Sequence, residues 1–123
     1  MDPFASALDQ AAAVRRREVS STELTRGYLE RIEKLNPRLN AYVLTTPELA
    51  LEQAKAADEA NIGYPLRGVP TSVKDLVSLA GYPLTFGSRA FEDYTLPMDF
   101  YPVARLKEEG CPCLLYTSDA ADE

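Results

Sequence analysis

A lysine at the end of a short apolar stretch is the residue with the clearest potential for chemistry in this chain. Apolar Val69 and Val73 alternate with less apolar neighbours, and this period of two residues predicts a strand over 69–73. Lys74 follows directly and falls on the opposite face of that strand from Val73. It is therefore either a solvated residue where the strand ends or a desolvated lysine that can act as a base.

A lysine that acts as a base must lose its proton near neutral pH. The ordinary lysine pKa is about 10.4, so a neutral amine at pH 7 costs roughly 4–5 kcal/mol. Burial away from carboxylates can lower a lysine pKa by up to ~3–5 units. Asp75 is adjacent, but in an extended backbone its side chain points to the opposite face from Lys74. On its own, a lysine at the end of a strand is more often a solvated residue.

The composition excludes several other kinds of site and location. The 123 residues contain no histidine, which rules out a Ser-His-Asp triad, a Cys-His pair and histidine metal ligands within them. The two cysteines, Cys111 and Cys113, imply neither a disulfide framework nor a metal site. We find no signal peptide and no apolar run near the ~20 residues that span a bilayer, so we expect a cytoplasmic protein without membrane contact.

The spacing of apolar and capping residues predicts an α/β chain that is mostly helical, with short strands. Asp2-Pro3 and the capping box Ser20-x-x-Glu23 each predict a helix start, and Asn36-Pro37 predicts the end of the second helix. The predicted elements are helices over 3–17, 21–36, 47–60 and 100–109, with Asp99 as the N-cap of the last helix, strands over 40–44 and 69–73, and a loop over 82–95.

Three ordered blocks resemble the amidase signature family. Gly68–Asp75 matches its G-V-P-x-x-x-K-D block, Gly81–Ser88 its G-x-x-x-T-x-G-S block, and Asp99 with Val103–Gly110 its D…V-x-R-L-x-x-x-G helix. The chain departs from this pattern in having one threonine before Gly87-Ser88, where the family usually has two, and in having Pro102 inside a helical stretch. The resemblance extends over nearly all of the chain up to Gly110.

The resemblance implies a fold and a mechanism. The family folds as an α/β/α sandwich around a mixed sheet, of which this chain would be an N-terminal fragment. Its members use a Ser–Ser–Lys arrangement and no cofactor. Lys74 matches the lysine of the family's first block, so the resemblance implies that Lys74 is the catalytic lysine. Both serines would lie in a Gly/Ser-rich stretch downstream of residue 123, so Ser72, Ser78 and Ser88 are not their counterparts. We therefore expect this fragment by itself to be inactive.

Three functions remain open at this level. The first, which we favour, is a standalone amidase that hydrolyses a small-molecule amide, with a homodimer as one option for the full-length protein. The second is the A-type subunit of the glutamyl-tRNA amidotransferase, which resembles the same motifs and would need a partner protein. The third is a non-catalytic helical interaction module in which Lys74 is incidental.

The end of the chain predicts a different origin from the rest. Residues 113–123 correspond to one reading frame of a common transposase sequencing adapter. We interpret 1–111 as part of an amidase domain and 112–123 as a non-native tail, the alternative being a natural, diverged C-terminus. The formal net charge is −6, and three of these negative charges lie in that tail. The remaining balance is only mildly acidic, and we expect no direct nucleic-acid binding.

Overall fold

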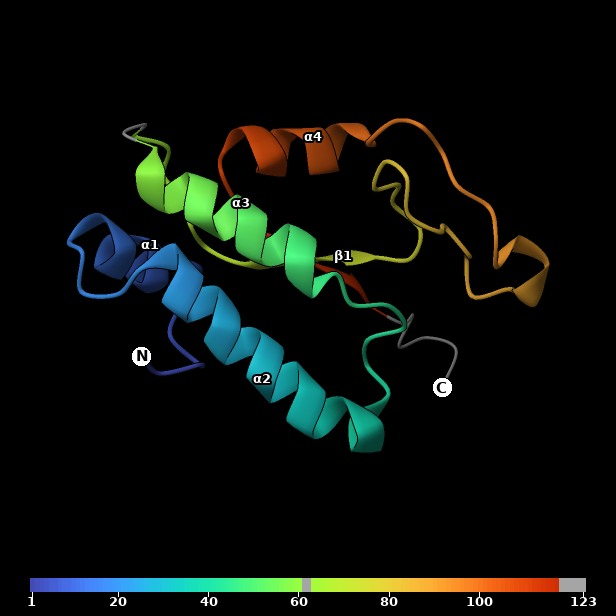
Figure 1. The fold of residues 1–123 in the computed structure, drawn as a ribbon, viewed down its shortest axis with the longest axis horizontal. Helices are drawn as coiled ribbons and strands as arrows, with labels where there is room; N and C mark the ends of the chain where they lie inside the picture. Colours follow the sequence, from blue (N-terminus) through green and yellow to red (C-terminus); the bar gives the residue numbers. More distant parts are fainter. Residues whose placement is uncertain (61–62, 118–123) are drawn as a thin grey trace.

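The computed structural model describes residues 1–60 and 63–117, and its helices surround a small parallel sheet (Figure 1). The sheet is formed by β1 (Thr71–Lys74) and β2 (Cys113–Thr117). The α-helices within these residues are α1 (Ala7–Arg15), α2 (Ser21–Leu39), α3 (Pro47–Glu59) and α4 (Tyr101–Glu108), and a 3₁₀ turn, η1, covers Arg89–Phe91. The α/β class predicted from the sequence is confirmed.

The two strands pair in parallel, with Thr71 opposite Cys113 and Lys74 opposite Thr117. The register shifts between Thr71 and Ser72, so the pairing is regular from Ser72 to Lys74. The strand begins two residues later than the sequence predicts. Pro70 has no backbone N–H to donate to a ladder, which favours a start after it.

Strand β2 forms from residues that we assigned to the non-native tail. Its first two residues, Cys113 and Leu114, are both buried. These residues therefore take part in the sheet. The adapter origin of the tail stays a prediction, and residues 118–123 lie outside the described part of the chain.

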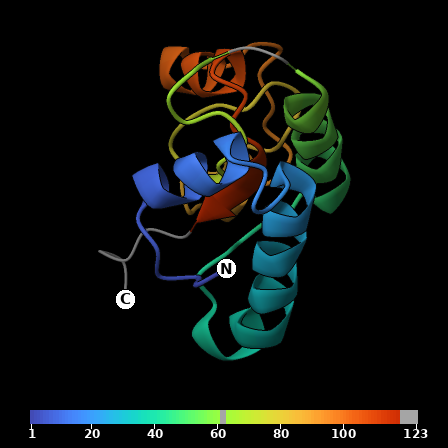
Figure 2. The same ribbon diagram turned by 90° about the vertical axis from the view of Figure 1, so that its left-hand side faces the viewer.

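The core lies between the sheet and the helices. Val73 of β1 and Cys113 of β2 form one buried cluster with Leu79 and with Val103 of α4. Helix α3 packs on α2 and on β2, and α4 lies on the opposite side of the molecule from α2 in both views (Figures 1 and 2). The buried side chains of α3 are all alanines, which allow this close approach of backbones: Ala50, Ala54 and Ala57.

The first two helices differ from the sequence prediction at their ends. Helix α1 begins after Ser6, whose hydroxyl accepts a hydrogen bond from the Asp9 amide, and not after Asp2. Helix α2 continues through Pro37 and ends at Leu39. The side-chain amide of Asn36 pairs with both backbone groups of Tyr42, at 2.8 and 2.9 Å. These bonds engage both backbone groups of Tyr42, and the strand predicted over 40–44 is not formed.

The end of α3 and the region of α4 follow the prediction more closely. Helix α3 covers the predicted range to within one residue. Helix α4 ends before Gly110, which has a left-handed backbone conformation with φ 76°, as is common for a glycine that follows a helix. Pro102 lies in the first turn of α4, where its missing N–H has no partner to lose. Asp99 is not its cap, because its carboxylate instead accepts bonds from the Ala80 amide and from Lys107.

Candidate active site

Lys74 is the last residue of β1, and its side chain is exposed on the face away from the core. The preceding side chain, Val73, is 6% exposed and belongs to the core cluster, so the opposed orientation predicted from the alternation is confirmed. The described residues therefore leave the Lys74 side chain exposed, whereas the sequence argument expects a base to be buried.

Two hydroxyl groups share this face of β1. Ser72 lies two residues before Lys74, which places both side chains on the same side of the strand. The Ser72 Oγ and Tyr42 Oη are 2.7 Å apart, a hydrogen bond that joins β1 to the segment after α2. The exposed face of β1 therefore carries a polar pair beside the lysine.

The residue after the lysine is directed the other way. Asp75 is only 5% exposed, and its carboxylate accepts hydrogen bonds from the backbone N–H of Thr85, at 2.8 Å, and from the Thr85 hydroxyl. Burial of a carboxylate requires such donors, because the charge otherwise loses its hydration without compensation. The structure thus ties the end of β1 to a residue ten positions downstream.

The residues after Thr85 form a tight turn. Phe86 and Gly87 both have positive φ, 52° and 72°, and the Ser88 amide donates to the Thr85 carbonyl at 2.8 Å. The Ser88 hydroxyl accepts a bond from the Ala90 amide at the start of η1. These bonds give Gly87 and Ser88 a structural role in a turn, within the stretch where the sequence predicts a loop.

A group of aromatic side chains extends from this turn. The Phe86 ring packs edge-on against Phe91 at 5.6 Å between centroids, and Tyr94 lies 5.8 Å from Phe91. All three are between 42% and 44% exposed. They lie in the long loop with η1 that extends from one end of the molecule (Figure 1).

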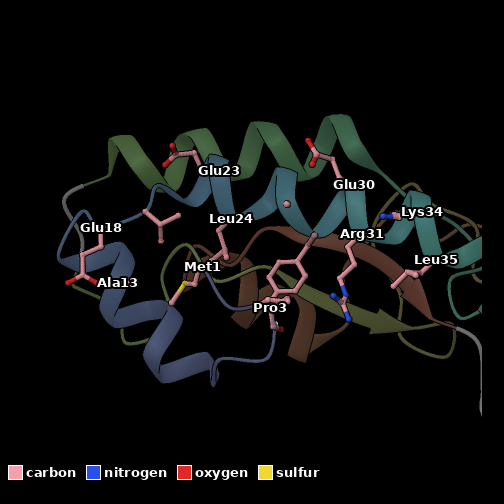
Figure 3. Close-up of a pocket in the computed structure, with 13 residues that line it drawn as sticks. Met1, Pro3, Ala13, Glu18, Glu23, Leu24, Glu30, Arg31, Lys34 and Leu35 are labelled. Atoms are coloured by element: carbon pink, nitrogen blue, oxygen red, sulfur yellow. Dashed lines mark hydrogen bonds between the residues drawn. The ribbon is translucent and has the colours of Figure 1, made fainter.

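A separate hollow of about 850 Å³ lies between the N-terminal segment and α2 (Figure 3). Pro3, Leu24 and Arg31 are among its lining residues, and Lys74 is not. Its walls combine apolar side chains with charges of both signs, as Glu30 and Lys34 illustrate. This hollow is therefore distinct from the lysine site.

The sequence identified Lys74 but missed the bond between Asp75 and Thr85. In the sequence, Asp75 was considered only as a negative charge next to Lys74, which would disfavour the neutral amine. A usable signal was present, because an acidic residue in a strand-like alternation falls on the core face and must find hydrogen-bond donors. Nothing in the sequence indicated which residue would supply them.

Comparison with known proteins identifies the family of this chain. A family model described as Amidase matches residues 23–118. The A-type subunit of the Glutamyl-tRNA(Gln) amidotransferase of Methylococcus capsulatus is 43% identical over 107 residues, which cover 85% of this chain and 22% of that protein. The protein of the same name from Dehalococcoides mccartyi is 44% identical over 104 residues, which cover 82% of this chain and 21% of that protein. The chain spans about a fifth of the length of these curated relatives.

Solved structures agree in fold. The native peptide amidase from Stenotrophomonas maltophilia superposes with a TM-score of 0.85 at 33% identity, covering 94% of this chain and 25% of that chain. A bacterial aryl acylamidase of the amidase signature family superposes with a TM-score of 0.81 at 29% identity, covering 93% of this chain and 25% of that chain.

Within the described residues, no helix is both long and apolar enough to cross a membrane.

Proposed function

This chain belongs to the amidase family, and on that basis we propose that the full-length protein cleaves the carbon–nitrogen bond of a carboxamide with Lys74 as general base. The observation that carries the proposal is the position of Lys74 at the carboxyl end of β1, on the face opposite the core, within the part of the chain that the family model matches. We expect no cofactor to be needed.

The proposed reaction proceeds through an acyl-enzyme. A serine Oγ supplied by the downstream part of the protein attacks the amide carbon, and its proton passes through a bridging serine to the Lys74 amine. The tetrahedral intermediate collapses, the carbon–nitrogen bond breaks, and the leaving amine takes up a proton. Water then hydrolyses the ester, which releases the carboxylic acid and restores the serine.

This role places a demand on the surroundings of Lys74. The amine must be neutral to accept a proton, and removal from water is the usual means of favouring the neutral form. Its exposure among the described residues leaves one face open to the groups that would desolvate it. We therefore propose that the downstream part of the protein, including both serines, covers this face.

Substitution of the lysine tests the proposal directly. In the full-length protein, Lys74→Ala should lower the rate of ammonia release from acetamide and benzamide by at least ~100-fold, since general-base catalysis contributes about 10²–10⁴-fold. Lys55→Ala, at an exposed position on α3, is the matched control and should retain the wild-type rate. Wild-type turnover in Lys74→Ala would refute the assignment. The 123-residue chain alone should show no turnover.

A second candidate is the A-type subunit of a glutamyl-tRNA amidotransferase. The curated relatives at 43% and 44% identity carry that name, and this observation favours it. Such a protein would work with a partner protein and would pass ammonia onward, whereas a standalone amidase would release it. The catalytic lysine would be the same residue in both cases.

The two candidates differ in what they require. A standalone amidase should hydrolyse simple amides at full rate as a purified single chain. An amidotransferase protein should instead release ammonia from glutamine, at a rate that rises when its partners are co-expressed. Ammonia release from glutamine and from benzamide, each measured with and without the partners, separates the two.

A further inference from the structure

We infer that Asp75 is a positioning residue for the reaction, which holds Lys74 in place by binding Thr85 across the end of β1. The inference rests on the proposed function, because it assigns a role to the neighbour of the proposed base. It concerns a contact between the two sequence blocks, Gly68–Asp75 and Gly81–Ser88, for which the resemblance by itself gives no reason.

The Asp75–Thr85 contact, called the connection below, joins a buried carboxylate to two hydrogen-bond donors. Asp75 is 5% exposed, and a carboxylate this buried is retained only where donors replace its lost hydration. Thr85 supplies both donors, its backbone N–H at 2.8 Å to Oδ1 and its hydroxyl to Oδ2. Hydrogen bonds to an ionised acceptor are roughly twice as strong as neutral ones, and two from one residue also fix orientation.

The connection reaches the lysine through the backbone on one side. The Lys74 carbonyl accepts a hydrogen bond from the Val77 amide at 3.0 Å, so a turn begins at the lysine itself and Asp75 lies inside it. Because the Asp75 side chain is held toward the core, the backbone at Lys74 cannot rotate without breaking the bonds to Thr85. The lysine side chain is thereby directed to the opposite, exposed face.

On the other side the connection reaches the tight turn. The Thr85 hydroxyl also accepts a bond from the Gly87 amide at 3.3 Å, and the Thr85 carbonyl accepts one from Ser88. The turn contains Phe86 in the left-handed region, which is strained for a residue other than glycine and persists only where its surroundings fix it. Asp75 therefore holds the lysine and this turn in one fixed arrangement.

Kinetics on the full-length protein test this role. Asp75→Ala should lower kcat for benzamide hydrolysis by about 10- to 100-fold, the effect of a small misplacement of a reacting group, with KM changed by less than about 3-fold. Asp75→Asn should restore kcat to within a few-fold of wild type, because its amide oxygen can accept from the Thr85 N–H and its NH₂ can donate to the Thr85 hydroxyl. Asp93→Ala is the matched control, because it removes an exposed carboxylate in the loop that contains Thr85.

Two further measurements cover failure to fold and failure of the proposed function. Thr85→Val keeps the side-chain volume and the backbone bond, and should lower kcat by an intermediate amount if Asp75→Ala does not fold. Hydrogen exchange of the Thr85 and Gly87 amides should be at least ~10-fold faster in Asp75→Ala than in Asp93→Ala.

The outcomes separate the inference from its premise. Wild-type kcat in both Asp75→Ala and Thr85→Val, or an equal loss in Asp75→Asn and Asp75→Ala, would overturn the inference while Lys74→Ala remains inactive. If the wild-type protein shows no hydrolysis that depends on Lys74, the proposed function fails. The connection is then judged by exchange alone, and unchanged exchange in Asp75→Ala overturns it too.

Discussion

Gly68→Ala should be among the most damaging single-methyl additions in this protein. Gly68 is buried, has φ +81°, and lies where the loop before β1 passes the start of α2. Its amide donates to the Gly110 carbonyl at 2.9 Å, and its own carbonyl accepts a bond from the Ser21 hydroxyl. The backbone is thus held from both sides and has little freedom to relax.

The expected loss has two parts. The left-handed conformation costs a residue with a Cβ roughly 1–2 kcal/mol. The added Cβ would also lie 3.0 Å from Val14 Cγ1 and 3.1 Å from Ser21 Cβ, closer than carbon atoms normally approach. Such overpacking costs about 1–3 kcal/mol, while the stiffer unfolded chain returns about 0.4–1 kcal/mol. We expect a net loss of about 2–4 kcal/mol in the free energy of unfolding.

A second glycine separates the two contributions. Gly81 has nearly the same φ, +80°, but a Cβ there would meet nothing within 4 Å. Gly81→Ala should therefore show only the conformational cost of about 1–2 kcal/mol, less the same return of about 0.4–1 kcal/mol, which leaves a net loss of roughly 0–1.6 kcal/mol. Urea unfolding followed by far-UV circular dichroism measures both variants, with trimethylamine N-oxide added to secure the folded baseline. Equal losses at the two positions would show that crowding at Gly68 contributes nothing.

Three other changes give distinct results. Asp58→Ala should cost about 1–2 kcal/mol in urea unfolding, because its carboxylate accepts bonds from the first two amides of α2, whereas exposed Glu59→Ala should be near neutral. Burial acts to raise the pKa of Asp99, but hydrogen bonds from the Ala80 amide and from Lys107 outweigh it, so the pKa is lowered. The ionised Asp99 therefore stabilises the folded state above about pH 4, and this contribution is lost as the pH falls further. Asp99→Asn should flatten the acid side of a curve of unfolding free energy against pH, and an unchanged slope would contradict this. Burial, with a nearby carboxylate, raises the pKa of the Cys111 thiol to about 11, so iodoacetamide at pH 8 should modify it roughly 100-fold more slowly in the folded than in the urea-unfolded chain, as peptide mass spectrometry would measure. Equal rates would show that the thiol is not protected.

Local signals in the sequence predicted most of the helical framework. The capping box at Ser20 and Glu23 is present with both of its bonds, and Pro47 opens α3 as expected. These features depend on residues within one turn of each other, so the sequence contains all the information needed. The family followed from ordered blocks in the same way, and the match over 23–118 confirms it.

The local rules failed where distant residues compete for the same backbone. The proline rule ended α2 at residue 36, but the bonds from Asn36 to Tyr42 and the left-handed Asn40 carry the helix to Leu39. Asp99 was the natural cap of α4, but Lys107 and the Ala80 amide take its carboxylate. The cap preference overridden at Asp99 is only about 0.5–2 kcal/mol, whereas proline inside a helix costs about 3 kcal/mol.

At the candidate site, too, the sequence determined some features and the tertiary structure decided others. The alternation of residues around Val73 determined that Lys74 points away from the core, because successive side chains of a strand must face opposite sides. Only the tertiary structure decided that Lys74 is exposed among these residues and that Asp75 is held by Thr85. Burial and hydrogen-bond partners depend on which segments pack together, and the periodicity of a single strand contains no information about its neighbours.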